Sequence, residues 1–194
     1  MPPADEFQYL TVLVSIILGL GLTQLLTGVG RLVQARAHVR GYWPPLLWVA
    51  LLFLIHVQSW WAMFELRDHR GWTFLEFLVV LLTPTTLYLM AALLIPDVSD
   101  ALDGDRTLDL RAHYYAQARW FFGAGVAVVA SSLLRPVVFD GHLPLDLDRG
   151  LQGVFAALAL AAAWSRRPRV HELAAAAAAA LYAAYVLLLF ARLR

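Results

Sequence analysis

Glu76, Thr83 and Pro84 are polar or helix-breaking residues inside the apolar stretch 72–96, and their spacing could build an ion or proton site. Proline has no N–H, so Pro84 leaves the carbonyl of Val80 without its helical donor. Glu76, Val80 and Thr83 share one face of a helix by their i, i+4 and i+7 spacing. A carboxylate, a free carbonyl and a hydroxyl would then line up, as in the kinked helices that form ion sites within membranes.

The same residues also allow a purely structural interpretation. Thr85 and Thr86 can bond back to the helix and repair the kink at Pro84. Glu76 stands about one helical turn from Trp72, so it can equally be a salt-bridged residue at the membrane interface. The sequence leaves both interpretations open.

Arg135 lies inside a second apolar stretch, 120–139, directly before Pro136. A lone charge at the centre of a membrane costs about 2.5–3.5 kcal/mol on insertion scales, and less toward the surface. Pairing with Glu76 would relieve both charges. The pair is expected to be either a structural clamp or part of a polar vestibule that leads toward His56. Secondary polar candidates on the same side are Glu65 and Ser131.

His56 is the only one of the six histidines that stands deep in an apolar stretch. Its charge changes near physiological pH, which makes it a candidate proton-responsive gate. The alternative is a neutral histidine satisfied in the core. Gln58 points to nearly the opposite side of the helix, since two residues rotate it by ~200°. Gln24 is a further buried amide, of a kind that more often joins helices than binds ligands.

The composition defines the elements that must position these residues. Of the 194 residues, 61% are hydrophobic and 15% charged, and the mean hydropathy is +0.66. These values exclude a disordered chain, a basic nucleic-acid binder and a soluble enzyme. The sequence has no cysteine and no lysine, which excludes thiolate, Schiff-base and Walker-loop chemistry. No cofactor or metal site is predicted, and an enzyme is less favoured than a protein without catalysis.

Uncharged runs of about 20 residues are long enough to cross a membrane. The sequence predicts an all-α polytopic membrane protein, a bundle of six transmembrane helices in a single domain, 1–194. The fifth segment is the least certain, because only ~16 uncharged residues separate Arg149 from Arg166. Three segments on each side of the polar loop 97–118 also suggest a 3+3 inverted repeat. The expected helices are 7–32, 43–66, 72–96, 117–139, 147–165 and 171–192.

The distribution of arginine predicts the orientation. The loops after segments one, three and five hold nine arginines against six on the other side, which places both termini outside an inner membrane. The absence of lysine and asparagine suggests a bacterial source. Small residues spaced by four on the first segment favour close helix packing near the bundle centre, or contact with a partner or second copy in the bilayer. They are Ser15, Gly19, Thr23 and Thr27.

Three classes of function remain. The leading hypothesis is a transporter or channel for a small solute or ion, with a polar outer vestibule at Glu76 and Arg135. The second is a non-catalytic membrane scaffold or sensor that acts through helix–helix partners. An enzyme that modifies a lipid or quinone is the third and weakest. A pocket that reaches His56 would favour transport, whereas a bundle packed fully around His56 would favour the scaffold.

Overall fold

The computed structural model describes residues 3–102 and 107–190, and they form an all-α bundle, as the sequence predicted. Each of the six predicted segments is a helix; the predicted end of the last, at residue 192, lies outside the described residues. A short helix and a two-stranded parallel pairing lie in the loops. The elements are α1 (Pro3–Gln34), β1 (Val39–Arg40), α2 (Trp43–Ala62), α3 (Phe74–Leu94), α4 (Ser99–Leu102), β2 (Leu108–Asp109), α5 (Leu110–Asp140), α6 (Leu147–Trp164) and α7 (Pro168–Tyr185).

Three shorter helical turns complete these elements. The turn Met63–Leu66 is a 3-10 helix that continues α2, and Val186–Phe190 is a π-helical turn that continues α7. Arg36–His38 forms a 3-10 turn between α1 and β1. The continuation of α2 matters for the site below, because it carries Glu65 to the end of the bundle.

The helix boundaries follow from local sequence. Thr73 caps α3 in a capping box: its hydroxyl accepts from the Glu76 N–H, and the Glu76 carboxylate accepts from the Thr73 N–H. Asp109 caps α5 by accepting from the backbone N–H groups of Arg111 and Ala112. Gly141 ends that helix with a positive φ of 73°, which suits glycine. The fourth predicted segment therefore starts earlier, at Leu110.

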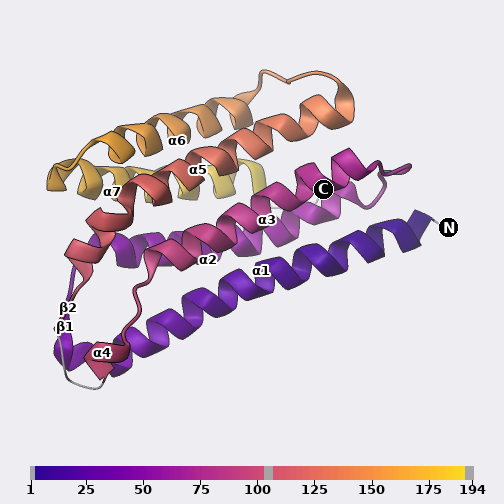
Figure 1. The fold of residues 1–194 in the computed structure, drawn as a ribbon. Helices are drawn as coiled ribbons and strands as arrows, with labels where there is room; N and C mark the ends of the chain where they lie inside the picture. The colour runs from indigo at the N-terminus through magenta and orange to yellow at the C-terminus, as the bar shows by residue number, and fades with distance from the viewer. Residues whose placement is uncertain (1–2, 103–106, 191–194) are drawn as a thin grey trace.

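The long helices run alternately up and down the bundle (Figure 1). β1, β2 and α4 lie at one end, together with the α6–α7 connection. The start of α1, the α2–α3 loop and the α5–α6 loop lie at the opposite end, which we call the loop end. α5 and α7 both run toward the loop end, so α6 must carry the chain back between them.

Five helices are long and apolar enough to cross a membrane: Glu6–Gln34, Trp43–Leu66, Phe74–Leu94, Leu110–Asp140 and Pro168–Leu188. α6 does not meet this standard of composition, but its 18 residues span about 27 Å beside α5 and α7. Large apolar side chains such as Val12, Leu26 and Leu89 stay exposed on the outside of the bundle. A surface of this kind is compatible with an integral membrane protein.

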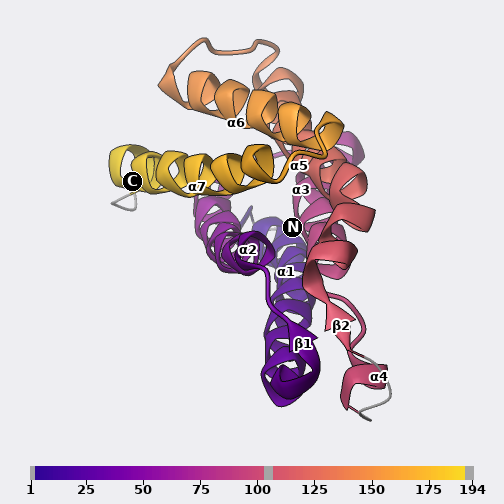
Figure 2. The same ribbon diagram turned by 90° about the vertical axis from the view of Figure 1, so that its left-hand side faces the viewer.

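Seen along its axis, the bundle is a ring of helices (Figure 2). α2, α3, α5, α6 and α7 follow one another around the ring, and α1 packs outside it against α2 and α3. The expectation that the first segment lies near the bundle centre is therefore wrong; α3, which packs against α1, α2 and α5, has that place. The two halves also pack differently, because α1 packs closely on α3 whereas α5 meets α7 around a single residue of α7, His171. The inverted repeat stays a prediction.

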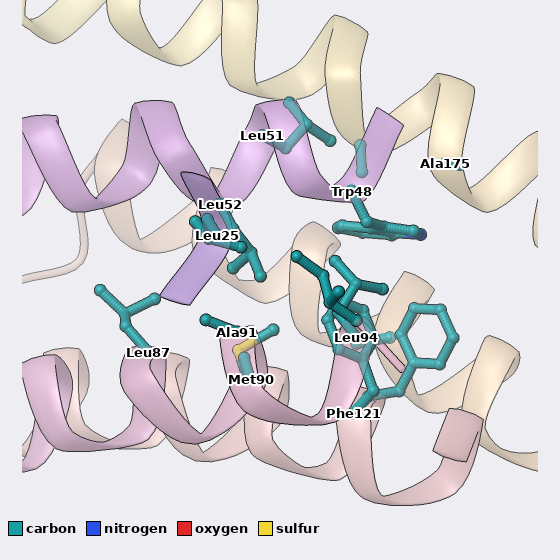
Figure 3. Close-up of a cluster of buried hydrophobic side chains, with 14 of the residues drawn as sticks. Leu25, Trp48, Leu51, Leu52, Leu87, Met90, Ala91, Leu94, Phe121 and Ala175 are labelled. Carbon is teal, nitrogen blue, oxygen red and sulfur yellow. The ribbon is translucent and has the colours of Figure 1, made fainter. Parts of the chain in front are cut away.

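The apolar core fills the ring toward the end that carries β1 and β2. Leu52 of α2 lies between Leu25 of α1 and residues of α3 such as Met90 in this core, whereas Leu51 points toward α7 (Figure 3). Farther along, Trp48 packs edge-on against aromatic rings of α5 and α6. This core closes one half of the ring and leaves the other half for a cavity.

A polar cavity inside the helix ring

A cavity of about 600 Å³ occupies the ring toward the loop end. It extends from Glu65 and Asp140, near the ends of their helices, to Thr83 and Val128, about halfway along α3 and α5. Phe155 lines the cavity and also packs edge-on against Trp48, so the aromatic core forms its floor. The polar and charged lining residues are Gln58, Ser59, Glu65, His69, Thr83, Ser131, Ser132, Arg135, Asp140, Asp148, Arg149, Gln152, Tyr182 and Tyr185.

α3 and α5 meet in the wall of the cavity through two hydroxyl groups. Thr83 Oγ1 lies 2.8 Å from Ser131 Oγ, and Ser131 Oγ donates to the carbonyl of Val128 at 2.8 Å. Because Ser131 has only one hydroxyl proton, Thr83 must be the donor between the two. Pro84 and Pro136, one on each helix, also line the cavity. Of the predicted candidates, Thr83, Pro84 and Ser131 are therefore brought together.

Arg135 also lines the cavity, but its partner differs from the expected one. Arg135 Nη2 lies 3.7 Å from Glu65 Oε2, so the ion pair joins α5 to the end of α2. The arginine side chain is 35% exposed and that of Glu65 58% exposed. The pair is long and partly solvated, so it is open to exchange with a charged solute.

Glu76 stands behind the cavity wall and does not pair with Arg135. Its Oε1 lies 3.3 Å from His69 Nε2, and its Oε2 accepts from the Thr73 N–H at 2.6 Å. His69 itself lines the cavity. Of the two interpretations of Glu76, the structure thus favours the structural one. Glu76 caps α3 and contacts a histidine at the loop end.

α6 and α7 contribute a polar network that sequence reasoning missed. Asp148 contacts the guanidinium of Arg149 and accepts from Gln152 Nε2 at 2.8 Å. The hydroxyl of Tyr185 on α7 bonds with Asp148 and with Gln58 of α2. Gln58 is therefore a cavity residue, joined to a neighbouring helix. The signal for this network was the i, i+1, i+4 spacing of Asp148, Arg149 and Gln152 at the start of the least apolar segment.

Two atoms of this network are buried without a hydrogen bond in the described part of the chain: Arg149 Nε and Gln152 Oε1. One is a donor and the other an acceptor, and both residues line the cavity. A buried polar atom without a partner costs about 1–3 kcal/mol, which a bound water or solute would recover. On the α6 side, the cavity wall therefore offers one donor and one acceptor to a polar molecule inside the cavity.

His56 lies outside this cavity, although Ile55 and Gln58 on the same helix line it. The imidazole is fully buried, and Nδ1 lies 2.7 Å from the carbonyl of Leu52. Nε2 has no hydrogen-bond partner among the described residues and faces α1, where a Cβ at Gly21 would overlap the ring. His56 is packed between α1 and α2, which leaves the expected route from the vestibule to His56 without support.

The remaining candidates lie on α1, which lines the cavity through Val14 and Leu18 but not through these residues. Gln24 is half-buried. The expected packing residues Ser15, Gly19, Thr23 and Thr27 are half-buried or exposed, and a Cβ at Gly19 would meet nothing within 4 Å. Gly21 and Gly28 make the close contacts, against His56 and Ile95. The predicted contact of the first four residues with a partner stays a prediction.

The opposite end of the ring holds a second buried histidine, His171 of α7. Its Nδ1 lies 3.1 Å from the hydroxyl of Tyr114, and its Nε2 lies 2.8 Å from the carbonyl of Ser165. Both ring nitrogens are therefore satisfied, with Nε2 as the donor to Ser165. Tyr115 and Phe122 pack around the ring. This cluster joins α7 to α5 and fills the ring of helices at the end opposite the cavity.

The residues that the structure describes contain no group of three or more His, Asp or Glu side chains placed to hold a metal ion. The chain matches no protein-family model, no curated protein and no solved structure. Its function is therefore argued from its own residues.

Proposed function

We propose that this protein is a transporter or channel that moves a small solute or ion across a cell membrane, and that the cavity is its outer vestibule. The observation that carries the proposal is a cavity of about 600 Å³, inside a ring of apolar helices, with charged groups of both signs on its wall. Binding sites for small molecules have volumes of about 300–1,000 Å³. Charged groups inside a membrane bundle are costly and mark substrate or ion pathways.

The position of the cavity supports access from one side of the membrane. Glu65 and Asp140 lie near the helix ends, while the floor at Phe155 and Trp48 is aromatic and closed. A solute that enters from the loop end would stop at this floor. Passage to the other side requires Trp48 and its neighbours on α5 and α6 to move, which fits a transport cycle better than a permanently open pore.

The charge pairs on the wall can exchange partners with a solute. Arg135 holds Glu65 at 3.7 Å across the gap between α5 and the end of α2. A solute with a charged group can replace either member of this long pair at little cost, because the pair is partly solvated. The polar groups deeper in the cavity, Thr83 and Ser131 among them, then receive the rest of the solute.

Flux in sealed proteoliposomes tests the proposal. The chain has no cysteine, so a thiol introduced by Ser132→Cys in the cavity wall is the only site for a charged methanethiosulfonate reagent. Flux of protons or alkali cations is followed with a fluorescent indicator under imposed gradients. We expect flux above that of empty vesicles, and its loss after the reagent reacts with Ser132→Cys.

Gly19→Cys is the matched control, because Gly19 lies on α1 away from the cavity and a side chain there meets nothing within 4 Å. Its modification should leave the flux unchanged. Arg135→Gln should lower the flux, while Asp68→Asn, which changes an exposed charge at the same end, should not. Equal flux in modified Ser132→Cys and unmodified protein would reject the cavity as the pathway.

The scaffold remains a second candidate, because one observation favours it. His56 is fully packed against Gly21 instead of reaching a pocket. Of the small residues on α1, Thr23 is exposed and a Cβ at Gly19 would meet nothing within 4 Å, whereas Ser15 accepts from the Trp60 indole N–H of α2. After extraction with a mild detergent, a scaffold should purify with a stoichiometric partner or as a defined oligomer. Recovery as an active, monomeric transporter would reject it.

A further inference from the structure

Pro84 and Pro136 remove the usual helical donors of two backbone carbonyls that belong to residues lining the same cavity. In a helix, the carbonyl of residue i−4 accepts from the N–H of residue i, and proline has none. The carbonyls concerned belong to Val80 on α3 and Ser132 on α5, and both of these residues line the cavity. Thr86, which could have repaired the α3 kink, donates instead to the carbonyl of Leu82 at 2.7 Å.

The two proline-containing segments meet at the Thr83–Ser131 contact, where the oxygens are 2.8 Å apart. Ser131 gives its proton to Val128, and Thr83 gives its proton to Ser131. Both hydroxyl protons are therefore used within the wall. What Thr83 and Ser131 can still offer a ligand is oxygen lone pairs, and the carbonyls of Val80 and Ser132 offer the same.

A set of oxygen acceptors without free protons suits a cation and repels an anion. Hard cations take oxygen ligands, and unwound or kinked membrane helices supply carbonyls for alkali cations in this way. The net charge of the cavity wall is negative, which also favours a cation. Its wall carries the carboxylates of Glu65, Asp140 and Asp148 against the guanidinium groups of Arg135 and Arg149, an excess of one negative charge.

We infer that the segments 80–84 of α3 and 131–136 of α5 form a binding site for a monovalent alkali cation, with ligands from the carbonyls of Val80 and Ser132 and the hydroxyl of Thr83. The proposed ligands are neutral, and the one charged side chain within these two segments, Arg135, is paired with Glu65. Ca²⁺ sites, in contrast, collect carboxylates as direct ligands, so the site is suited to a single positive charge. The inference rests on the proposed function for its biological role, but cation binding itself can be measured without transport.

The test is thermal unfolding of the purified protein in detergent with Na⁺ or K⁺, at constant ionic strength set with N-methyl-D-glucamine chloride. A cation that binds the folded state raises Tm in a saturable way. We expect this for the wild type with one of the two cations. Pro84→Ala restores an N–H to the Val80 carbonyl, and Thr83→Val removes the hydroxyl. Each should weaken the apparent affinity about tenfold or more, a scale typical of lost contacts at metal sites.

Pro84→Ala should not lower the Tm measured without the cation, because alanine favours a helix interior over proline. Thr86→Val is the matched control: it removes a threonine hydroxyl of the same helix that bonds outside the cavity. Its cation response should equal that of the wild type. The absence of any saturable response, or a full response in both Pro84→Ala and Thr83→Val, would overturn the inference.

Flux and cation binding separate the two proposals. Saturable cation binding that depends on Thr83, in a protein without flux, would support the site and reject transport. Flux through the cavity without a response to Na⁺ or K⁺ would support transport and reject the site.

Discussion

At the scale of single residues, burial and partners separate polar side chains that look alike in the sequence. His56 and Glu76 are both buried, but neither lines the cavity: His56 packs against Gly21, and Glu76 bonds with His69 and the Thr73 N–H. Thr83 and Arg135 are less buried and do line it. The position of a polar residue deep in an apolar stretch therefore shows that its burial costs free energy. The direction of its side chain decides whether it lines the cavity, where a solute could contact it.

The contact between Gly21 and His56 gives a prediction at this scale. Gly21→Ala should lower the free energy of unfolding by about 1–3 kcal/mol, because a Cβ at Gly21 would overlap the buried imidazole and force α1 and α2 apart. Unfolding of the purified variant in detergent, followed by tryptophan fluorescence, measures the change.

Gly19→Ala is the control, since a Cβ there meets nothing within 4 Å. It should be as stable as the wild type or slightly more so, because alanine is the better helix former. The double variant Gly21→Ala/His56→Ala should recover part of the loss. A Gly21→Ala protein as stable as Gly19→Ala would show that α1 does not pack on His56 as described.

At the scale of elements, α3 positions most of the site. Its capping box fixes where the helix starts, and its position beside α1, α2 and α5 holds Thr83 and Pro84 at the cavity wall. α6 contributes its polar first turns, with Asp148, Arg149 and Gln152 at the cavity. Those polar residues also explain why α6 is not among the helices whose composition suits a membrane span.

The capping box leads to a prediction for α3. Thr73→Ala should cost about 0.5–2 kcal/mol of stability, because the Glu76 N–H loses its acceptor at the start of the helix. Glu76→Gln should cost less than Glu76→Ala, because glutamine can still accept from the Thr73 N–H. Denaturation of the three variants in mixed detergent measures both differences.

The same variants address the role of Glu76 in transport. If its role is to cap α3, Glu76→Gln should keep the flux of the wild type. A large loss of flux in Glu76→Gln, with stability unchanged, would instead assign the carboxylate a direct part in transport.

At the scale of the whole molecule, the path of the chain decides how many times it crosses the membrane. α5 and α7 run in the same direction and both are long and apolar enough to span a membrane, so we expect α6 to cross in the opposite direction. The start of α1 and the end of α7 then face the same side. The loops after α1, α3 and α6 face the other side, where most of the arginines lie.

Accessibility of single cysteines tests this topology. In a chain that has no cysteine of its own, His142→Cys in the α5–α6 loop and Arg166→Cys in the α6–α7 connection each introduce one thiol. We expect an impermeant maleimide to label His142→Cys from outside intact cells, and Arg166→Cys only in inverted vesicles, since arginine-rich loops stay inside.

Asp68→Cys and Arg40→Cys serve as references for the two sides, because the α2–α3 loop and β1 lie at opposite ends of the bundle. Labelling of His142→Cys and Arg166→Cys from the same side would mean that α6 does not cross. The reverse pattern for all four positions would keep the six crossings and invert the predicted orientation.

The sequence by itself determined the class of fold and most of the helices. A run of about 20 apolar residues has one low-energy form in a membrane, since a helix satisfies every backbone group internally. Capping is equally local, as the Asp109 cap at the start of α5 and the Thr73 capping box at the start of α3 show. The identity of several cavity residues followed for the same reason: Thr83, Arg135 and Ser131 are polar where lipid makes polarity costly.

Only the tertiary structure decided which of these residues meet. Whether Arg135 pairs with Glu76 or with Glu65 depends on the rotation and spacing of α2, α3 and α5, which no local pattern encodes. The same holds for His56, whose depth was evident but whose direction toward Gly21 was not. The polar turns of α6 became part of a site because α6 packs beside α5 in the ring and joins Gln58 of α2 and Tyr185 of α7 at the same cavity, a relation between segments far apart in the chain.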